Sequence, residues 1–241
     1  MSIAGNLSEV RERIAQAARR AGRDAREVAL MAVSKNHPGS AILEAIAAGQ
    51  VLFGENRVQE FAGKRGQVMA ASGTGKFHLI GHLQSNKAAK AAELFDAVDS
   101  VDSLRLAERL NDAAMKLNRH LDVLIEVNVG GEEAKSGLEP ESQELRTLLE
   151  AQPRLKNLEI RGLMTVPPYT EDSEGARGCF RSLRELRDRL SVQSGLKLAE
   201  LSMGMSHDFE VAIEEGSTCV RVGTAIFGAR PYAAPYEESA G

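Results

Sequence analysis

Short runs of β-branched and aliphatic residues alternate with helical patterns along this 241-residue chain, and this alternation limits the possible folds most strongly. It is typical of parallel βα units, in which a helix follows each strand. About eight strands are expected, beginning about 27 residues apart on average, which matches the period of a (β/α)8 TIM-type barrel. Their expected ranges are 28–33, 50–53, 77–80, 95–98, 122–127, 158–164, 197–201 and 219–222. An open, doubly wound α/β sheet is the competing interpretation.

An extra helix is expected before the first strand, because Ile3, Leu7, Val10 and Ile14 recur at helical spacing and Gly22 follows as a stop. Further helical patterns cover residues 41–48, 104–117, 145–149, 180–190 and 209–213. No linker interrupts the series. We therefore expect a single domain over residues 1–241, with its barrel core at about 28–230.

Composition excludes several classes of protein. The chain carries 30 Lys and Arg against 34 Asp and Glu, a net charge of −4, so we expect no nucleic-acid partner and no anionic-membrane partner. No apolar run reaches the length of a membrane span, and the first residues do not resemble a secretion signal. Its two cysteines, Cys179 and Cys219, are far apart in the chain, which favours a reducing, cytoplasmic setting.

Polar residues follow most of the expected strands, where a parallel barrel forms its active site. Lys35 is the most informative, because an apolar run leads directly into it. A partly desolvated lysine at a barrel mouth can act as a nucleophile and form a Schiff base. An ordinary solvated lysine is the alternative.

Small, donor-rich segments follow the last two expected strands, the usual phosphate-binding position in such a barrel. The segment 202–206 includes Met203 and supplies a flexible turn, and the Ser206 hydroxyl is placed to cap the helix expected at 209–213. Gly223 and Thr224 form the second segment. We therefore expect a phosphate site here, although a simple tight turn and helix cap would give the same pattern.

Arg221 interrupts the apolar strand expected at 219–222, and a buried guanidinium requires a partner. A carboxylate such as Glu126 is one candidate. The ring nitrogen of a pyridine cofactor is the other. No metal site is expected, because His78 and His82 straddle a strand end and no cysteine cluster is present.

Several segments together resemble one known family, the pyridoxal phosphate homeostasis proteins, also called proline synthase co-transcribed proteins. The match to this family runs in order from about residue 28 to residue 230. The segments that carry it are residues 32–35, 53–60, 78–87, 162–165, 201–206 and 216–228.

The resemblance implies a single barrel of fold type III, similar to the N-terminal domain of alanine racemase, with pyridoxal 5′-phosphate (PLP) in Schiff-base linkage to Lys35. It also implies that Arg221 faces the pyridine nitrogen, that Asn56 lies near the ring, and that the segments around Ser206 and Gly223 hold the phosphate. The full predicted set of cofactor-binding residues is Lys35, Asn56, Met203, Ser206, Arg221, Gly223 and Thr224, with no catalytic residue and no metal.

Members of this family bind and buffer PLP and maintain vitamin B6 balance without established turnover, so apo forms of PLP-dependent enzymes become candidate partners. We expect a monomer. The chain departs from the family pattern at His37, where a second lysine is frequent, so a part for His37 or Lys135 in cofactor exchange stays open.

A PLP-dependent amino-acid racemase is the alternative function. Racemisation needs a second base opposite the lysine, which in alanine racemase is a tyrosine from another domain. Of the three tyrosines, only Tyr169 is expected near the site, since Tyr232 and Tyr236 follow the last strand.

Overall fold

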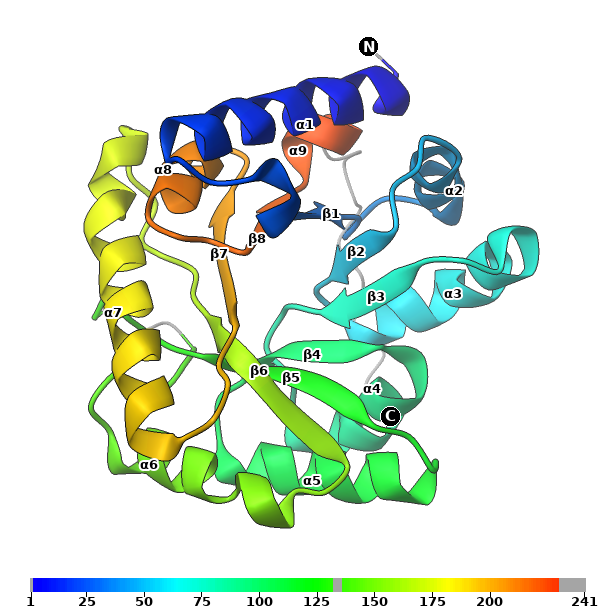
Figure 1. Ribbon diagram of the computed structural model, residues 1–241. Helices are drawn as coiled ribbons and strands as arrows, with labels where there is room; N and C mark the ends of the chain where they lie inside the picture. The colour runs from blue at the N-terminus through cyan, green and yellow to red at the C-terminus, as the bar shows by residue number, and fades with distance from the viewer. Residues whose placement is uncertain (1, 132–135, 230–241) are drawn as a thin grey trace.

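The computed structural model describes residues 2–131 and 136–229, in which eight parallel strands close into a barrel (Figure 1). Neighbours along the chain pair in order, and β8 pairs with β1 through Met31↔Arg221 and Ala32↔Val222. This closure confirms the expected barrel and excludes the open sheet. The strands are β1 (Ala29–Val33), β2 (Leu52–Glu55), β3 (Lys76–Leu79), β4 (Ala97–Val101), β5 (Leu121–Glu126), β6 (Leu158–Met164), β7 (Glu200–Met205) and β8 (Cys219–Val222).

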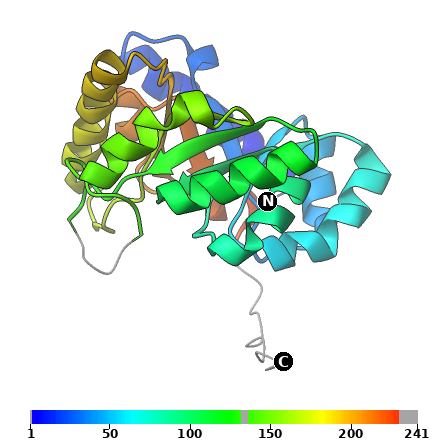
Figure 2. The same ribbon diagram turned by 90° about the horizontal axis from the view of Figure 1, so that it is seen from below.

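Helices lie on the outside of the strands, as the two perpendicular views show (Figures 1 and 2). Three of them, α3, α4 and α9, were not predicted. The pattern of α3 is weak because it contains Gly63 and Gly66 and its apolar residues follow no clear stripe. The helices are α1 (Ile3–Arg20), α2 (Gly39–Ala47), α3 (Val58–Ser72), α4 (Ala88–Leu94), α5 (Leu104–Lys116), α6 (Gln143–Glu150), α7 (Arg177–Ser194), α8 (Phe209–Glu214) and α9 (Thr224–Phe227).

The extra N-terminal helix is confirmed as α1. Ser2 caps it by accepting a hydrogen bond from the Gly5 amide, and Leu7, Val10 and Ile14 are buried beneath it. Figure 1 shows α1 lying across α8 and α9, which follow β7 and β8. The helix therefore supports the elements that lead into and out of the last strands.

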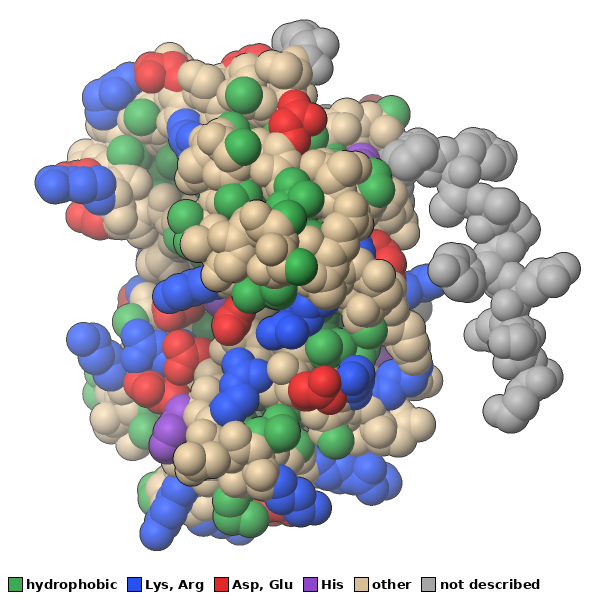
Figure 3. Space-filling model, turned by 90° about the vertical axis from the view of Figure 1, so that its right-hand side faces the viewer, with side chains coloured by type: hydrophobic (Ala, Val, Ile, Leu, Met, Phe, Trp, Pro, Cys, Tyr) green, Lys and Arg blue, Asp and Glu red, His purple; other side chains and the backbone are tan. Residues whose placement is uncertain are grey.

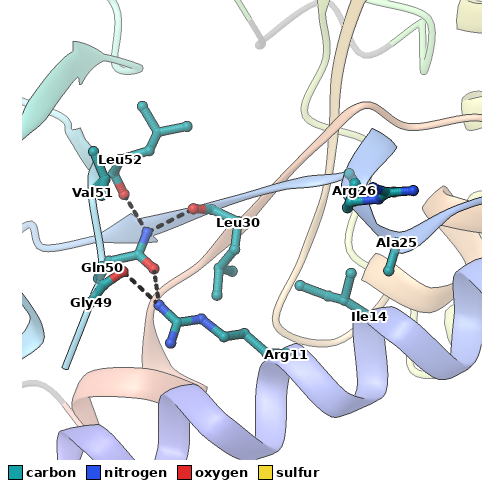
Figure 4. A pocket seen from close by; sticks show the side chains of 10 residues that line it. Arg11, Ile14, Ala25, Arg26, Leu30, Gly49, Gln50, Val51 and Leu52 are labelled. Atoms are coloured by element: carbon teal, nitrogen blue, oxygen red, sulfur yellow. Dashed lines mark hydrogen bonds between the residues drawn. The ribbon is translucent and has the colours of Figure 1, made fainter.

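A pocket lies between α1 and the first two strands, and several of its polar lining groups are hydrogen-bonded to one another (Figure 4). Arg11 donates to the Gly49 carbonyl at 3.0 Å and to the Gln50 side chain at 3.2 Å. The Gln50 amide donates in turn to the carbonyls of Leu30 and Leu52, both at 2.7 Å. These hydrogen bonds join α1 to the first two strands. Because the polar groups already have partners, the pocket is a weak candidate for a ligand site.

Contacts between phenylalanine rings attach α3 to the barrel. The ring of Phe61 on α3 lies 4.6 Å from that of Phe77 on β3 and 4.9 Å from that of Phe95, and Phe77 stacks on Phe53 of β2 at 5.3 Å. All four side chains are buried. Burial of such rings contributes both area and preferred aromatic geometry, so α3 has an apolar anchor of its own.

The expected end of β7 is wrong. The strand continues to Met205, whereas residues 202–206 were expected to form a flexible turn. A register irregularity between Ser202 and Met205, with Gly204 at φ +94°, lets the chain remain in the sheet at the residues whose types suggested a loop. The expected Ser206 cap is also wrong: α8 begins after Asp208, whose carboxylate accepts a hydrogen bond from the Met205 amide at 2.6 Å.

A cluster of arginines fixes the far end of α8. Glu215 is buried, and it pairs with Arg177, Arg181 and Arg184 of α7 at 3.0–3.2 Å. Hydrogen bonds from Arg181 and then Arg177 hold the pKa of the Glu215 carboxyl below its usual value. The carboxyl end of α8 is therefore attached to α7.

Elsewhere on the surface, basic and acidic side chains are interspersed, as the face in Figure 3 shows. No helix within the described residues is long and apolar enough to cross a membrane.

Candidate functional site

A cavity of about 490 Å³ opens where the strands end, at the carboxyl edge of the barrel. Six of the seven predicted cofactor-binding residues line it: Lys35, Asn56, Ser206, Arg221, Gly223 and Thr224. Met203 is not among the lining residues. Its side chain is fully buried, and Met205 lines the cavity instead. The sequence reasoning also missed Val33, Ile80 and His207. Val33 and Ile80 are apolar but lie within the segments 32–35 and 78–87 that carry the family resemblance, and His207 directly follows the segment expected to bind phosphate.

Arg221 carries the cavity's buried positive charge, with 4% of its surface exposed. It donates to the Ser202 hydroxyl at 2.8 Å and to the Thr165 carbonyl at 2.7 Å. Glu126, the carboxylate considered as its partner, instead accepts a hydrogen bond from Ser136 at 2.9 Å. Burial lowers the pKa of Arg221, although guanidinium groups stay charged in proteins. The charge is thus held by neutral groups and is available to a ligand.

Lys35 lies two residues after the end of β1, and its half-buried side chain lines the cavity. The next residue, Asn36, is in the left-handed region at φ +62°, so the chain turns sharply there. Asn56, after β2, presents a buried Oδ1 atom that has no hydrogen-bond partner within residues 2–131 and 136–229. A buried acceptor of this kind calls for a donor, which a ligand in the cavity can supply.

Small residues and donors form the side of the cavity near α9. The Gly223 amide donates to the Ser206 hydroxyl at 3.3 Å, which brings together the two segments expected to bind phosphate. A Cβ atom on Gly223 would lie 3.3 Å from the Val33 carbonyl, a tight approach. Ser206, Gly223 and Thr224 therefore form a compact group of hydroxyl and amide groups next to β1.

Two aromatic rings stand at the rim of the cavity. Tyr169 and His207 have ring centroids 5.7 Å apart, and 80% of the Tyr169 surface is exposed. Tyr169 is thus near the site, as expected. Tyr232, Tyr236 and Lys135 lie outside the described residues.

The histidines considered for metal binding have separate carboxylate partners. His78 Nδ1 lies 3.0 Å from Asp99, and His82 Nδ1 lies 3.0 Å from Asp102. Nowhere in residues 2–131 and 136–229 do three potential ligands of this kind gather. Cys219 is a buried thiol, and burial raises its pKa to about 12, whereas Cys179 is only half-buried.

The fold and the position of the cavity define an alanine-racemase-like barrel, and the family model described as "Alanine racemase, N-terminal domain" matches residues 5–231. The pyridoxal phosphate homeostasis protein of Aquifex aeolicus is 47% identical over 96% of this chain and all of its own length. That of Pseudomonas aeruginosa is also 47% identical, over 97% of this chain and 98% of its own. This chain belongs to the pyridoxal phosphate homeostasis protein family.

Solved structures agree with this family. PipY of Synechococcus elongatus, in a structure described as having PLP bound, superposes with a TM-score of 0.83 at 41% identity, over 94% of this chain and all of PipY. Alanine racemase from Corynebacterium glutamicum gives a TM-score of 0.68 at 20% identity, over 95% of this chain and 60% of the enzyme. The second comparison supports the fold alone.

One glycine at the site has a role that substitution can test. A Cβ on Gly81 would lie 2.4 Å from the carbonyl oxygen of Asn56 and 2.9 Å from its Cα atom. Gly81→Ala must therefore displace the backbone that carries Asn56, and we expect a loss of about 1–3 kcal/mol in the free energy of unfolding. Urea denaturation measures it.

Gly63→Ala in α3 is the matched control, because a Cβ there meets nothing within 4 Å. It should leave stability unchanged or raise it by about 0.5–1 kcal/mol through helix propensity. Equal stability of Gly81→Ala and the wild type would show that the close approach to Asn56 is unimportant.

Proposed function

We propose that this protein binds PLP in the cavity, with Lys35 as the attachment point, and serves as a buffer and carrier of the cofactor. The observation that carries the proposal is the meeting of Lys35, Arg221 and the Ser206–Gly223 pair at one cavity. The names of the relatives and the PLP-bound PipY structure support the same ligand.

The residues present fit the chemistry of PLP. The group at Ser206, Gly223 and Thr224 offers the hydroxyl and backbone N–H donors that a phosphate accepts from. The unpartnered Asn56 Oδ1 offers an acceptor on the side of Lys35. When bound, PLP supplies an aldehyde that condenses with a primary amine and a pyridine ring that withdraws electrons.

Arg221 determines what the site does with the ring. A permanently charged guanidinium, held by Ser202 and Thr165, disfavours a proton on a ring nitrogen facing it. An unprotonated pyridine nitrogen is a weak electron sink. The site is therefore better suited to holding the cofactor than to stabilising a carbanion.

The open rim favours storage over catalysis as well. Tyr169, the racemase-like candidate base, is 80% exposed and lies in the loop after β6. Water at such a mouth promotes exchange of the cofactor and competes with controlled proton abstraction. We propose that the protein has no catalytic turnover, that it acts as a monomeric single domain in the cytoplasm, and that apo PLP-dependent enzymes receive its cofactor.

Removal of the attachment point tests the proposal directly. Lys35→Ala should lose the visible absorbance band of the covalently held cofactor, because the amine that condenses with the aldehyde is gone. Absorbance spectra of both proteins after addition of PLP and gel filtration measure this. Lys90→Ala, on an exposed position of α4, is the control and should keep the band. A band of wild-type intensity in Lys35→Ala would assign the aldehyde to another lysine, such as Lys87.

Incubation with L-alanine in deuterium oxide separates storage from racemisation. We expect no deuterium at Cα beyond the rate with free PLP, because Tyr169, the candidate second base among the described residues, is 80% exposed and not shielded from water. Mass spectrometry and optical rotation follow the reaction. Exchange at an enzyme-like rate that falls on Tyr169→Phe would establish the racemase alternative.

A further inference from the structure

A buried ion pair is bonded to the turn that carries Lys35. Lys64 of α3 is 8% exposed, and its Nζ lies 2.8 Å from Glu55 Oε1 at the end of β2. Glu55 is fully buried, and it also accepts a hydrogen bond from the Ser34 hydroxyl at 2.6 Å. Neither Lys64 nor Glu55 lines the cavity.

Lys64 and its neighbour Glu60 hold the backbone on both sides of Lys35. Lys64 Nζ donates to the carbonyls of Ser34 at 3.0 Å and His37 at 3.1 Å. Glu60 Oε1 accepts from Lys64 Nζ at 2.9 Å and from the Asn36 amide at 2.6 Å. Residues 34, 36 and 37 are thereby fixed, which stabilises the left-handed turn at Asn36.

Stability alone does not account for this arrangement. A buried ion pair can often be replaced by apolar side chains without loss of stability. Helix α3 also has its own apolar anchor in the packing of Phe61 against Phe77 and Phe95. Two of the four contacts made by Lys64 Nζ go to carbonyls of the Lys35 turn, at Ser34 and His37, which indicates a role in the geometry of that turn.

We propose that Lys64, held by Glu55 and Glu60, is a positioning residue that aims Lys35 into the cavity and sets the rate at which Lys35 captures the PLP aldehyde. This inference rests on the proposed function. Four acceptors surround the Lys64 ammonium, which has three N–H donors, so Lys64 is not itself available as a nucleophile.

The reaction at Lys35 is a condensation. The Nζ lone pair forms a bond to the aldehyde carbon, and the aldehyde oxygen leaves with both amine hydrogens as water. The step needs no oxidant or reductant. Its rate depends on how the amine is placed relative to a bound aldehyde, and misplacement by about 1 Å can cost on the order of a hundredfold.

Two variants test the positioning. Glu60→Ala removes the acceptor for the Asn36 amide at a partly exposed side chain, and it leaves the buried Glu55–Lys64 pair in place. Lys64→Met combined with Glu55→Gln replaces the fully buried Glu55–Lys64 pair by neutral side chains, and the one carboxylate that loses its partner, Glu60, is partly exposed. Lys90→Met on α4 is the control for loss of a surface lysine.

Two measurements separate positioning from folding. The first is the affinity for pyridoxine 5′-phosphate, which keeps the ring and phosphate but has an alcohol in place of the aldehyde. The second is the rate at which the visible band grows after mixing with PLP. We expect the analogue's affinity to stay within about twofold of wild type and the capture rate to fall about tenfold or more in both variants.

A capture rate equal to that of the wild type, or an equal loss of capture rate and analogue affinity, would overturn the positioning role. If the double variant does not fold, the capture rate and analogue affinity of Glu60→Ala alone decide whether the positioning role holds. Failure of the proposed function is distinct, because the wild type itself would then neither bind the analogue nor develop the band.

Discussion

The hydrogen bonds between β1 and β8 close the barrel, and the whole site depends on that closure. Their register pairs Met31 with Arg221 and Ala32 with Val222. Parallel strands that are paired in this way end at the same edge, so Lys35 leaves the barrel beside Gly223 although the two are far apart in the chain. An open sheet with the same strands would place β1 and β8 in different surroundings. Closure therefore brings the amine and the donor-rich segments to one cavity.

The two buried cations near the site, Arg221 and Lys64, differ in their hydrogen-bond partners. Arg221 is held by a hydroxyl and a carbonyl, so its charge is not cancelled by a direct carboxylate partner. Lys64 is surrounded by carboxylates and carbonyls and lies outside the cavity lining. Burial favours the neutral form of Glu55, whereas Lys64 and Ser34 favour its charged form; the net effect raises the pKa of its carboxyl. One cation thus lines the cavity, and the other bonds to the turn that carries Lys35.

The sequence predicts the barrel well because its strands alternate regularly with helices, and the ranges expected for β6 and β8 match those observed. Lys35 and Gly223 were identified by their position after expected strands, and Arg221 as a charge inside an apolar strand. The end of β7 was missed because Ser202 and Gly204 belong to types that favour turns, and only the bulged register of the closed barrel keeps them in the sheet. Residues buried by tertiary contacts, such as Lys64, give no local signal, since a lysine on a helix is normally solvated.

Lys35 is the one residue to which we propose that the cofactor is attached. The most direct test is to load the wild-type protein with PLP, reduce it with borohydride, digest it and identify the modified peptide by mass spectrometry. We predict that the added mass is found on Lys35 at close to one equivalent. Modification spread over several surface lysines, or concentrated on a residue outside the cavity such as Lys90, would contradict the account.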